Sequence, residues 1–421
     1  MHKPSATRRP DPRTGARTLL AAIREGMDLD TAERGLDLPP SERARARRLA
    51  LTTLRHRARA EAVLAPLLHR RPRPAVMDAL SLAVTEMLAL DEAPHGVVNA
   101  TVSALRHGSQ KSAAAAGMAN AVLRKAADSR AVWDSAAPAR LPDWLRGPVA
   151  AAWGEAAATA IEAAHEATPP IDLTPRPGAT LPEGELLPTG SLRLIGPTHV
   201  SALPGYAEGA WWVQDAAAAL PARLLDPQPG ETVADLCAAP GGKTLQLAAA
   251  GAQVSAIDIA PARMRRLAEN LARCGLGAQT VTADALAWRP DAPLDAVLLD
   301  APCSATGTIR RHPELPLLRD GSGLAELTAL QAQLIDHALT LLRPGGRLVY
   351  AVCSLLPAEG EDQLAAALAR HPGLTITPAD PTQLGIPADW VTPQGAIRTR
   401  PDFWADRGGI DGFFIACLRV G

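Results

Sequence analysis

The sequence predicts an α/β protein in which residues 226–421 form a mostly parallel, doubly wound sheet, preceded by an all-helical domain and a small α+β insert. Three observations lead to this fold class. After residue 226, apolar runs of four to six residues alternate with helical segments, as do strands that are buried on both faces of a sheet. Before residue 130, apolar residues recur at helical spacing without a strand pattern. Between the two lies a stretch rich in Pro and Gly.

The composition is that of a globular protein of a reducing compartment. The chain has 421 residues, 47% of them apolar and 21% charged, a length that predicts about two or three domains. None of its five cysteines precedes Cys237 and no two form a C-x-x-C pair, which argues against a disulfide framework or a zinc module. We expect no metal site. The N-terminus lacks an apolar leader, and no apolar run reaches about 18 residues, so we expect a cytoplasmic protein without a membrane span.

The net charge of −1 results from a basic part and an acidic part of the chain whose charges nearly cancel. Residues 1–75 carry 17 Lys and Arg against 8 Asp and Glu, whereas residues 76–421 carry 26 against 36. A basic end of this kind can follow a phosphate backbone and release its counterions. It can equally be the solvated face of helices in an arginine-biased chain, since 39 of the 43 basic residues are Arg. Both interpretations stay open on charge alone.

The N-terminal part is predicted to be helical. Residues 1–14 read as a disordered basic arm and residues 15–130 as one helical domain. Ser41 followed by residues 43–64 predicts a capped helix, and Val76, Leu80 and Val84 continue the helical spacing. Two later helices carry Asn99 and Asn120.

Residues 131–225 are predicted to be a linker or small α+β subdomain. A helix is expected early in this stretch, and short strands at residues 171–174, 192–195 and 211–213. Trp211 and Trp212 are neighbours on the last of these strands. Successive strand residues face opposite sides, so we expect one Trp in the core and one on an exposed face, rather than a platform for stacking bases.

Unusual side chains stand at the carboxyl ends of the predicted strands of residues 226–421. Open parallel sheets bind ligands at that edge. The residues concerned, each at or just past the end of a strand, are Cys237, Asp258, Asp284, Asp300 and Cys353.

The first of these strands runs into a glycine turn. Glycines there let the backbone approach a ligand closely, and the free amides of the next helix favour a carboxylate or another anion. A phosphate loop is the rival interpretation, because Gly242, Lys243 and Thr244 match its end. Its first required glycine falls on Cys237, so we disfavour an ATP or GTP site.

Two aspartates extend this turn into a nucleoside site. Asp258 is placed to accept hydrogen bonds from ribose hydroxyls, and Asp284 could receive an adenine amino group. Either one alone would be read as a helix N-cap. Acidic residues in register on successive strands favour a nucleoside whose tail is not a phosphate, and S-adenosylmethionine is the cofactor that fits.

Cys303 and Cys353 follow the next two predicted strands, and we expect both to lie close to Asp300 and Lys243. A thiolate is favoured near cations and is the nucleophilic form of cysteine. Carbon 5 of cytosine becomes nucleophilic only after a thiolate has added to carbon 6, and protonation near the ring nitrogen by a carboxylic acid helps that addition. The target base must be unpaired or flipped out of its helix.

The motifs CAAPGGKT, DAPCS followed by RR and PE, CS with a following P and E, and DGFF together resemble the RNA (cytosine-5) methyltransferase family. Residues 15–130, with EMLAL, HGVVNATVSAL and GMANAVLR, resemble the NusB-like RNA-binding domain that some bacterial members carry. The resemblance covers most of the chain. Two departures stand out: Ala351 and Val352 replace the usual Ser-Thr, and Glu359-Gly-Glu361 replaces Glu-Glu-Asn.

The resemblance implies a Rossmann-like methyltransferase domain and a role for each site residue. It makes Cys353 the nucleophile and Cys303 the residue of product release, with Lys243 and Asp300 near the base. DNA cytosine methyltransferases attack instead from a Pro-Cys pair, here Pro302 and Cys303. The implied cofactor contacts are Cys237, Ala238, Ala239, Pro240, Gly241, Gly242, Lys243, Asp258, Asp284 and Asp300.

The implied partner is 16S ribosomal RNA, free or in an unassembled small subunit, bound by a monomeric enzyme without a membrane partner. Two alternatives remain at this point. The same chemistry could act on transfer RNA, or the chain could be a non-catalytic RNA-binding scaffold.

Overall fold

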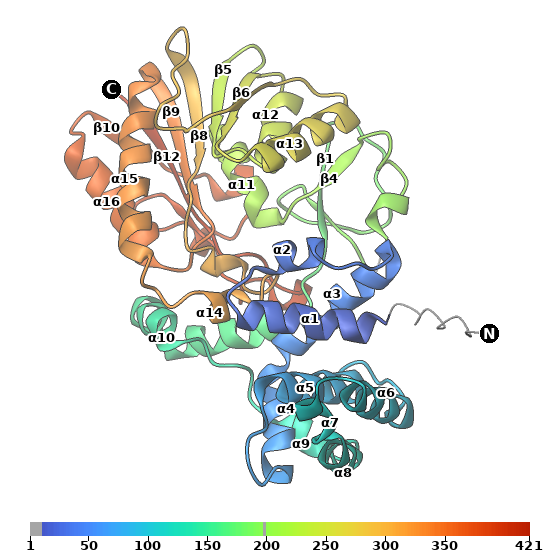
Figure 1. The fold of residues 1–421 in the computed structure, drawn as a ribbon. Helices are drawn as coiled ribbons and strands as arrows, with labels where there is room; N and C mark the ends of the chain where they lie inside the picture. Colours follow the sequence, from blue (N-terminus) through green and yellow to red (C-terminus); the bar gives the residue numbers. More distant parts are fainter. Residues whose placement is uncertain (1–10, 197–198) are drawn as a thin grey trace. The chain divides into compact units, whose positions relative to one another are not determined.

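The computed structural model describes residues 11–196 and 199–421, which form two compact units (Figure 1). Unit 1 comprises the described residues up to Arg146, together with His165–Thr168 and Ile309–Asp320. Unit 2 comprises Gly147–Ala164, the described part of Pro169–Thr308, and Gly321–Gly421. Of the expected disordered arm, residues 1–10 lie outside the described residues, and the prediction is wrong for residues 12–14, which begin helix α1 behind the side-chain cap of Asp11.

Unit 1 is helical, and none of its described residues forms a strand, as predicted. Its apolar residues make two cores, one centred on Leu80, Val84 and Leu123 and the other on Leu19, Ile23 and Leu49. Its helices are α1 Pro12–Arg24, α2 Leu29–Arg34, α3 Pro40–Arg55, α4 Arg57–Leu64, α5 Pro74–Leu88, α6 Pro94–Arg106, α7 Gln110–Ala113, α8 Ala116–Ala126, α9 Arg130–Ser135 and α14 Leu315–Leu318.

The predicted helix over residues 43–64 is wrong at both its start and its middle. Helix α3 begins at Pro40, after Pro39, without a side-chain cap. Proline suits the first helical position because it has no N–H to leave unpaired. The helix then breaks at His56, whose ψ of 17° ends α3 before α4 begins.

Helix α10, Asp143–Glu166, contains a non-helical Gly154 with φ 85°. Within unit 2 a small antiparallel sheet follows, with β1 Asp172–Pro175, β2 Glu185–Leu186, β3 Leu192–Arg193 and β4 Trp211–Val213 in the order β2-β3-β1-β4. The predicted strands at 171–174, 192–195 and 211–213 are thus present. Asp172 and Arg193 join β1 to β3 by a buried bidentate ion pair of 2.7 and 2.8 Å.

The expected exposed face of the Trp211 and Trp212 pair is wrong. Trp211 is 0% and Trp212 3% exposed. They face opposite sides of β4, and each side is covered: Trp211 packs with Leu173 and Leu192, and Trp212 with Leu245 and Met264 of the neighbouring helices. Both indole N–H groups donate inside the protein, to Pro204 O and Gln214 Oε1.

The large sheet of unit 2 has the order β10-β12-β9-β8-β5-β6-β7, and β11 pairs with β12. Strands β9, β8, β5, β6 and β7 are parallel neighbours, whereas β12 is antiparallel to β9 and β10. The predicted mostly parallel sheet is therefore confirmed. The strands are β5 Thr232–Leu236, β6 Gln253–Asp258, β7 Gln279–Thr282, β8 Leu294–Asp300, β9 Leu342–Val352, β10 Leu374–Thr377, β11 Ile397–Arg398 and β12 Phe414–Val420.

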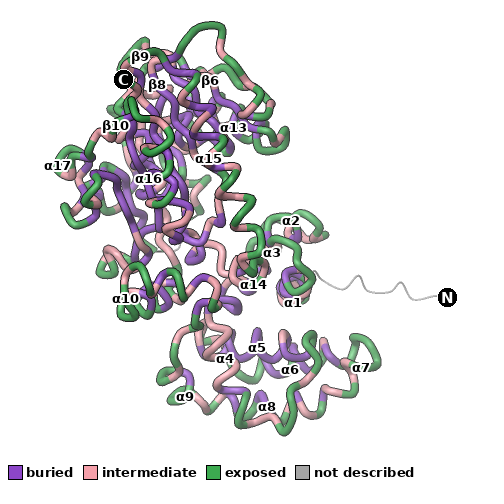
Figure 2. The backbone as a smooth tube through the Cα atoms, turned by 90° about the vertical axis from the view of Figure 1, so that its left-hand side faces the viewer, coloured by how far each residue is buried: buried purple, intermediate pink, exposed green. Residues whose placement is uncertain are grey.

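Helices cover both faces of this sheet, and the strands between them are largely buried (Figure 2). One face packs against α11 Ala216–Leu225 and α12 Gly242–Ala249, and the other against α15 Leu324–Thr340 and α16 Glu361–Arg370. Alternate residues of β8 divide between the two cores, with Leu298 on the first and Leu299 on the second. Helix α13, Pro261–Cys274, lies beside α12. Cys274 and Cys417 are buried, as expected for core residues.

Among the described residues, no helix is long and apolar enough to cross a membrane.

Candidate active site

The parallel strands of unit 2 bring the residues singled out from the sequence to one edge of the sheet. Asp258 and Asp300 are the last residues of β6 and β8, and Cys237 and Cys353 directly follow β5 and β9. Asp284 comes two residues after β7. Because these strands run in the same direction, their carboxyl ends lie on the same side of the domain, where open α/β sheets bind ligands.

Two thiols meet at this edge. The Sγ atoms of Cys303 and Cys353 lie 3.5 Å apart, and neither cysteine is in a disulfide. The hydrogen bond with Cys353, together with burial, raises the pKa of Cys303 well above its ordinary value. Cys303 therefore stays a thiol at neutral pH.

A buried cation lies beside these thiols. Lys243, 8% exposed, donates from Nζ to Asp300 Oδ2 at 2.7 Å. Its Nζ also lies 5.6 Å from the centre of the Phe413 ring. Burial alone would lower the pKa of Lys243, but the Asp300 carboxylate outweighs burial and raises this pKa. Lys243 therefore stays protonated beside Asp300, and its ammonium group can stabilise an anionic sulfur or an electron-rich base nearby.

The turn after β5 has a backbone that only a few residue types accept. Cys237 has φ 61° and Gly241 φ 106°, and a Cβ on Gly241 would approach Leu267 Cγ to 2.7 Å. Asp258 fixes this turn, since Oδ2 accepts from Ala239 N at 3.1 Å. Its Oδ1 accepts from Ala260 N at 2.9 Å. The turn thus leads into α12 with its backbone held against the end of β6.

Cys237 is chemically inert in this arrangement. Burial, with the negative charges of Asp300 and Asp258, raises the pKa of its thiol to about 12. Of the three cysteines at the carboxyl edge, Cys237 is therefore a lining residue of the turn and not a nucleophile.

The residues at β6 and β7 fit a nucleoside-bearing cofactor. Ile259, next to Asp258, exposes 69% of its surface although it is a large apolar residue. An exposed apolar side chain at a ligand edge can cover the face of a planar base. Asp284 is exposed, and its Oδ1 accepts from Leu286 N at 2.9 Å, which leaves Oδ2 available. Asp258 keeps one lone pair on each oxygen for hydroxyl groups.

Sequence reasoning missed several residues of this edge. Ile259 carried no motif, and Phe413 was noticed only within DGFF. The segment around Phe413 reaches the site because Gly412 N donates to Gly307 O at 2.8 Å, and a Cβ on Gly307 would lie 1.9 Å from Gly412 O. The low aromatic content also hid a cluster in which the Trp390 ring stacks on Phe403 at 5.1 Å and meets Trp404 at 4.9 Å.

One buried carboxyl below the glycine turn makes stability depend on pH. Burial raises the pKa of Asp235 to about 7, although Thr244 Oγ1 donates to it at 2.6 Å. Unfolding returns this carboxyl to its ordinary pKa of 3.8. Between these values the folded protein holds a proton that the unfolded chain releases, so its contribution to stability falls as the pH rises, by up to about 1.4 kcal/mol per pH unit.

We therefore expect Asp235→Asn, which cannot ionise, to gain stability relative to the wild type from pH 4 to 7, with a constant difference above about pH 8. Urea unfolding across this range measures the difference. A difference that does not change with pH would mean that Asp235 is ionised throughout.

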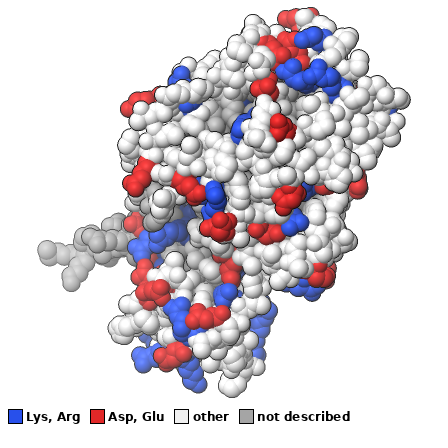
Figure 3. Space-filling view, turned by 180° about the vertical axis from the view of Figure 1, so that it is seen from behind, with Lys and Arg blue, Asp and Glu red and all other residues white. Residues whose placement is uncertain are grey.

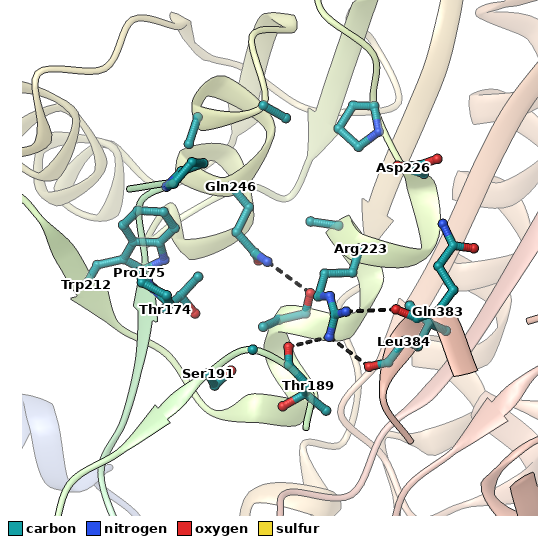
Figure 4. Close-up of a pocket in the computed structure, with 17 residues that line it drawn as sticks. Thr174, Pro175, Thr189, Ser191, Trp212, Arg223, Asp226, Gln246, Gln383 and Leu384 are labelled. Atoms are coloured by element: carbon teal, nitrogen blue, oxygen red, sulfur yellow. Dashed lines mark hydrogen bonds between the residues drawn. The ribbon is translucent and has the colours of Figure 1, made fainter. Parts of the chain in front are cut away.

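A separate cavity of about 390 Å³ lies away from the thiols (Figure 4). It is lined by the last turns of α11 and α12 and by residues of the small sheet. The last turn of α12 is at the opposite end of this helix from the glycine turn. Its guanidinium group, on Arg223, donates to the backbone carbonyls of Thr189, Gln383 and Leu384. Arg223 therefore joins three chain segments, and we assign it a structural role.

Basic residues of the first 75 positions are partly neutralised within unit 1. Arg13 pairs with Glu86 at 2.8 Å, and Arg47 pairs with Asp30 and Glu33 at 2.7 and 2.6 Å. On the face shown in Figure 3, acidic side chains are interspersed among the basic ones. Other basic side chains of unit 1 remain exposed, namely Arg70, Arg71, Arg73, Arg106, Lys111, Arg124 and Lys125.

A parallel sheet that ends in antiparallel strands, with a glycine turn after its first strand and an acidic residue at the end of its second, defines a Rossmann-like methyltransferase domain. Solved structures support this class. The crystal structure of PH0851 has a TM-score of 0.69 and 25% identity, covering 97% of this chain and 98% of that chain. A methyltransferase homologue from Pyrococcus horikoshii has a TM-score of 0.54 and 28% identity, covering 65% and 94%.

Comparison with known sequences is more specific. The family model for 16S rRNA methyltransferase RsmB/F matches residues 222–419, and that of the NusB family matches residues 16–128. Ribosomal RNA small subunit methyltransferase B of Pseudomonas syringae pv. tomato is 37% identical over 97% of this chain and 96% of its own length. The protein of the same name from Serratia proteamaculans is 50% identical over 43% of each chain.

The chain therefore belongs to the RsmB/F family of 16S ribosomal RNA methyltransferases and carries an N-terminal NusB domain. It is an enzyme, and its family makes S-adenosylmethionine the cofactor, as the sequence predicts. The family resemblance and the fold class expected from the sequence are both confirmed.

Proposed function

We propose that this enzyme methylates carbon 5 of cytosine in 16S ribosomal RNA, with Cys353 as the nucleophile of a covalent protein–RNA intermediate. The observation that carries this proposal is the pair of thiols, Cys303 and Cys353, 3.5 Å apart at the carboxyl ends of adjacent strands. They lie on the same edge as the Lys243–Asp300 pair. Methylation of an oxygen or nitrogen atom needs no thiol, whereas carbon 5 of a pyrimidine does.

The reaction begins with addition of the Cys353 thiolate to carbon 6 of the base. A bond forms between Sγ and carbon 6, and the electron pair of the carbon 5–carbon 6 double bond moves toward the carbonyl and ring nitrogen. Carbon 5 is then enamine-like and nucleophilic. Lys243, held cationic by Asp300, stabilises the negative charge that develops on the ring.

The addition product gains its methyl group at carbon 5. S-adenosylmethionine, when bound, supplies an electrophilic methyl group. A base next removes the proton from carbon 5, and the returning electron pair restores the double bond while the bond from Sγ to carbon 6 breaks. We assign this release to Cys303, because its sulfur lies 3.5 Å from that of Cys353. The Cys303 thiol can give its proton to the departing Cys353 sulfur, and the thiolate so formed can take the proton from carbon 5.

Besides pairing with Lys243, Asp300 can act directly on the cytosine base. Its carboxylate lies at the end of β8, with its side chain 33% exposed, so its second oxygen can face a ligand. A carboxyl group there can give or accept a proton at the ring nitrogen of cytosine, which assists the addition of sulfur.

The alternative attack from Pro302 and Cys303 is disfavoured, because the raised pKa of Cys303 leaves little thiolate on this residue. For the cofactor, we propose contacts with the glycine turn and with Asp258 and Asp284. Residues 237–243 of that turn lie beside Asp258, which holds their backbone.

The helical domain would hold the RNA. Its exposed basic side chains, among them Arg124 and Lys125 on α8, can neutralise phosphates. Asn99 is exposed on α6 and Asn120 is half-buried on α8, so neither is only a packing residue. We further propose that the enzyme acts as a monomer in the cytoplasm, on 16S RNA that is free or part of an unassembled small subunit.

Mapping of 5-methylcytosine in ribosomal RNA by bisulfite sequencing tests this function. A strain that lacks the gene is compared with strains that express the wild type or Cys353→Ala. We expect one 16S position to lose its methyl group in the deletion strain and to regain it only with the wild type. A mark that is lost from transfer RNA instead would identify a different substrate. Unchanged methylation of all RNA would favour a non-catalytic RNA-binding scaffold.

A further inference from the structure

Glu359 is a buried carboxylate that the proposed reaction does not use. It ends the short 3-10 helix Pro357–Glu359, six residues after Cys353, and exposes 0% of its surface. A buried charge of this kind is unfavourable unless hydrogen bonds satisfy it, so its surroundings must supply donors.

Four hydrogen bonds reach this carboxylate. Its Oε1 accepts from Ser304 N at 2.8 Å and from Gln331 Nε2 at 3.0 Å. Its Oε2 accepts from the hydroxyls of Ser304 and Ser354, both at 2.5 Å. Ser304 directly follows Cys303, and Ser354 directly follows Cys353. One carboxylate therefore holds the residues next to both cysteines.

Further bonds close the two cysteine loops on each other around Glu359. Gly307 N donates to Cys353 O at 3.0 Å, and Leu355 N donates to Thr306 Oγ1 at 2.9 Å. The hydroxyls of Ser304 and Ser354 lie 3.2 Å apart. Gln331 also donates to Pro302 O at 2.9 Å, which fixes the residue before Cys303 to α15. The 3.5 Å spacing of the thiols depends on this network.

Charge is arranged unequally around the two thiols. The negative charge of Glu359 is among the influences that raise the pKa of Cys303, after its hydrogen bond with Cys353 and its burial. Lys243 interacts electrostatically with Cys353, and this interaction is among the influences that raise the pKa of the lysine. The negative charge of Glu359 thus opposes a thiolate at Cys303, whereas the ammonium group of Lys243 acts on Cys353.

We propose that Glu359 is a positioning residue for the methyl transfer: it ties the two cysteine loops together, and its charge keeps Cys303 in the thiol form while Cys353 attacks. This rests on the proposed function, because the two thiols have different tasks only in a covalent mechanism.

The variants Glu359→Gln and Glu359→Ala separate the two parts of the role. Glutamine has the same shape, its carbonyl can accept from Ser304 N and Gln331, and its amide can donate to the two serine hydroxyls, so it keeps the contacts and removes only the charge. Alanine removes both. Gln331→Met is the matched control, since it removes the two hydrogen bonds of Gln331, to Glu359 and to Pro302 O, and leaves the charge of Glu359.

The test is the pH dependence of iodoacetamide labelling of each thiol in the free protein, read by mass spectrometry. In Glu359→Gln we expect the labelling midpoint of Cys303 to fall below that of the wild type, because the variant removes a negative charge that opposes its thiolate. In Gln331→Met the Cys303 midpoint should not fall. An unchanged Cys303 midpoint in folded Glu359→Gln would overturn the proposal. The labelling measurement requires no RNA, so its result is independent of whether the methylated base is cytosine.

Kinetics and a second variant complete the test. We expect kcat to fall at least about tenfold in Glu359→Gln and further in Glu359→Ala, with the KM for S-adenosylmethionine unchanged. If Glu359→Gln does not fold, Glu359→Asp keeps the charge but shortens its reach by one methylene. A fall in kcat of at least about tenfold with a folded protein is then the expected result, and wild-type kcat would overturn the positioning role.

Discussion

Cys353→Ala is expected to lose methyl transfer to RNA by at least about 10³-fold, because the reaction then has no group that can add to carbon 6. The fold and the cofactor site should survive, since Cys353 is half-buried at the end of β9 and its backbone bond from Gly307 does not involve the side chain. Transfer of a labelled methyl group from S-adenosylmethionine to unmodified 16S RNA measures the rate.

The matched control is Cys417→Ala. Cys417 is 2% exposed in the core of the same sheet, on β12, and its removal affects its packing and its contact with Thr377, away from the proposed site. We expect this control to keep its rate at 25 °C while losing some thermal stability. Full activity of Cys353→Ala would exclude it as the nucleophile, and an equal loss in both variants would point to damage of the sheet.

Cys303→Ala is expected to behave in the opposite way, by accumulating protein that is covalently bound to RNA. If Cys303 takes part in release, the bond from Cys353 Sγ to carbon 6 forms normally but is not broken. Turnover should then stop after about one methyl transfer per enzyme. A denaturing gel shows the adduct as a band of reduced mobility that disappears on RNase treatment.

The double variant Cys303→Ala with Cys353→Ala provides the control, and it should give no adduct. An adduct in Cys353→Ala but not in Cys303→Ala would exchange the two roles and support attack from Pro302 and Cys303. The 3.5 Å spacing of the two sulfur atoms makes both outcomes geometrically possible, so the gel discriminates between them.

Most parallel strands of unit 2 were predictable because they hold short apolar runs, such as residues 296–299 of β8, between helical segments. The short strands β10 and β11 were not. Ile397–Arg398 has only two residues, and it is a strand only because β12 lies beside it. The error on Trp212 has the same origin, since its burial comes from helices that are distant in the sequence.

The candidate site was predictable to the extent that strand ends mark it. Cys303, Cys353, Asp300 and Lys243 stood out because thiols and charges interrupt apolar strands and a glycine turn. The role of Glu359 could not be predicted, because the sequence does not show that a glutamate in a loop accepts four hydrogen bonds. Sequence spacing identifies the residues that one sheet edge brings together, whereas burial and hydrogen bonding depend on tertiary packing.

The central claim is that Cys353 forms the bond to the RNA, and the site of attachment tests it most directly. Wild-type enzyme is incubated with S-adenosylmethionine and 16S RNA that contains 5-fluorocytidine. Fluorine at carbon 5 cannot leave as a proton does, so the intermediate persists after methyl transfer. Digestion with RNase and trypsin separates the two cysteines, because the cleavable residues Arg310, Arg319 and Arg347 lie between them. We predict that the modified nucleotide is attached to the peptide that contains Cys353; attachment to the peptide that contains Cys303 would contradict the account.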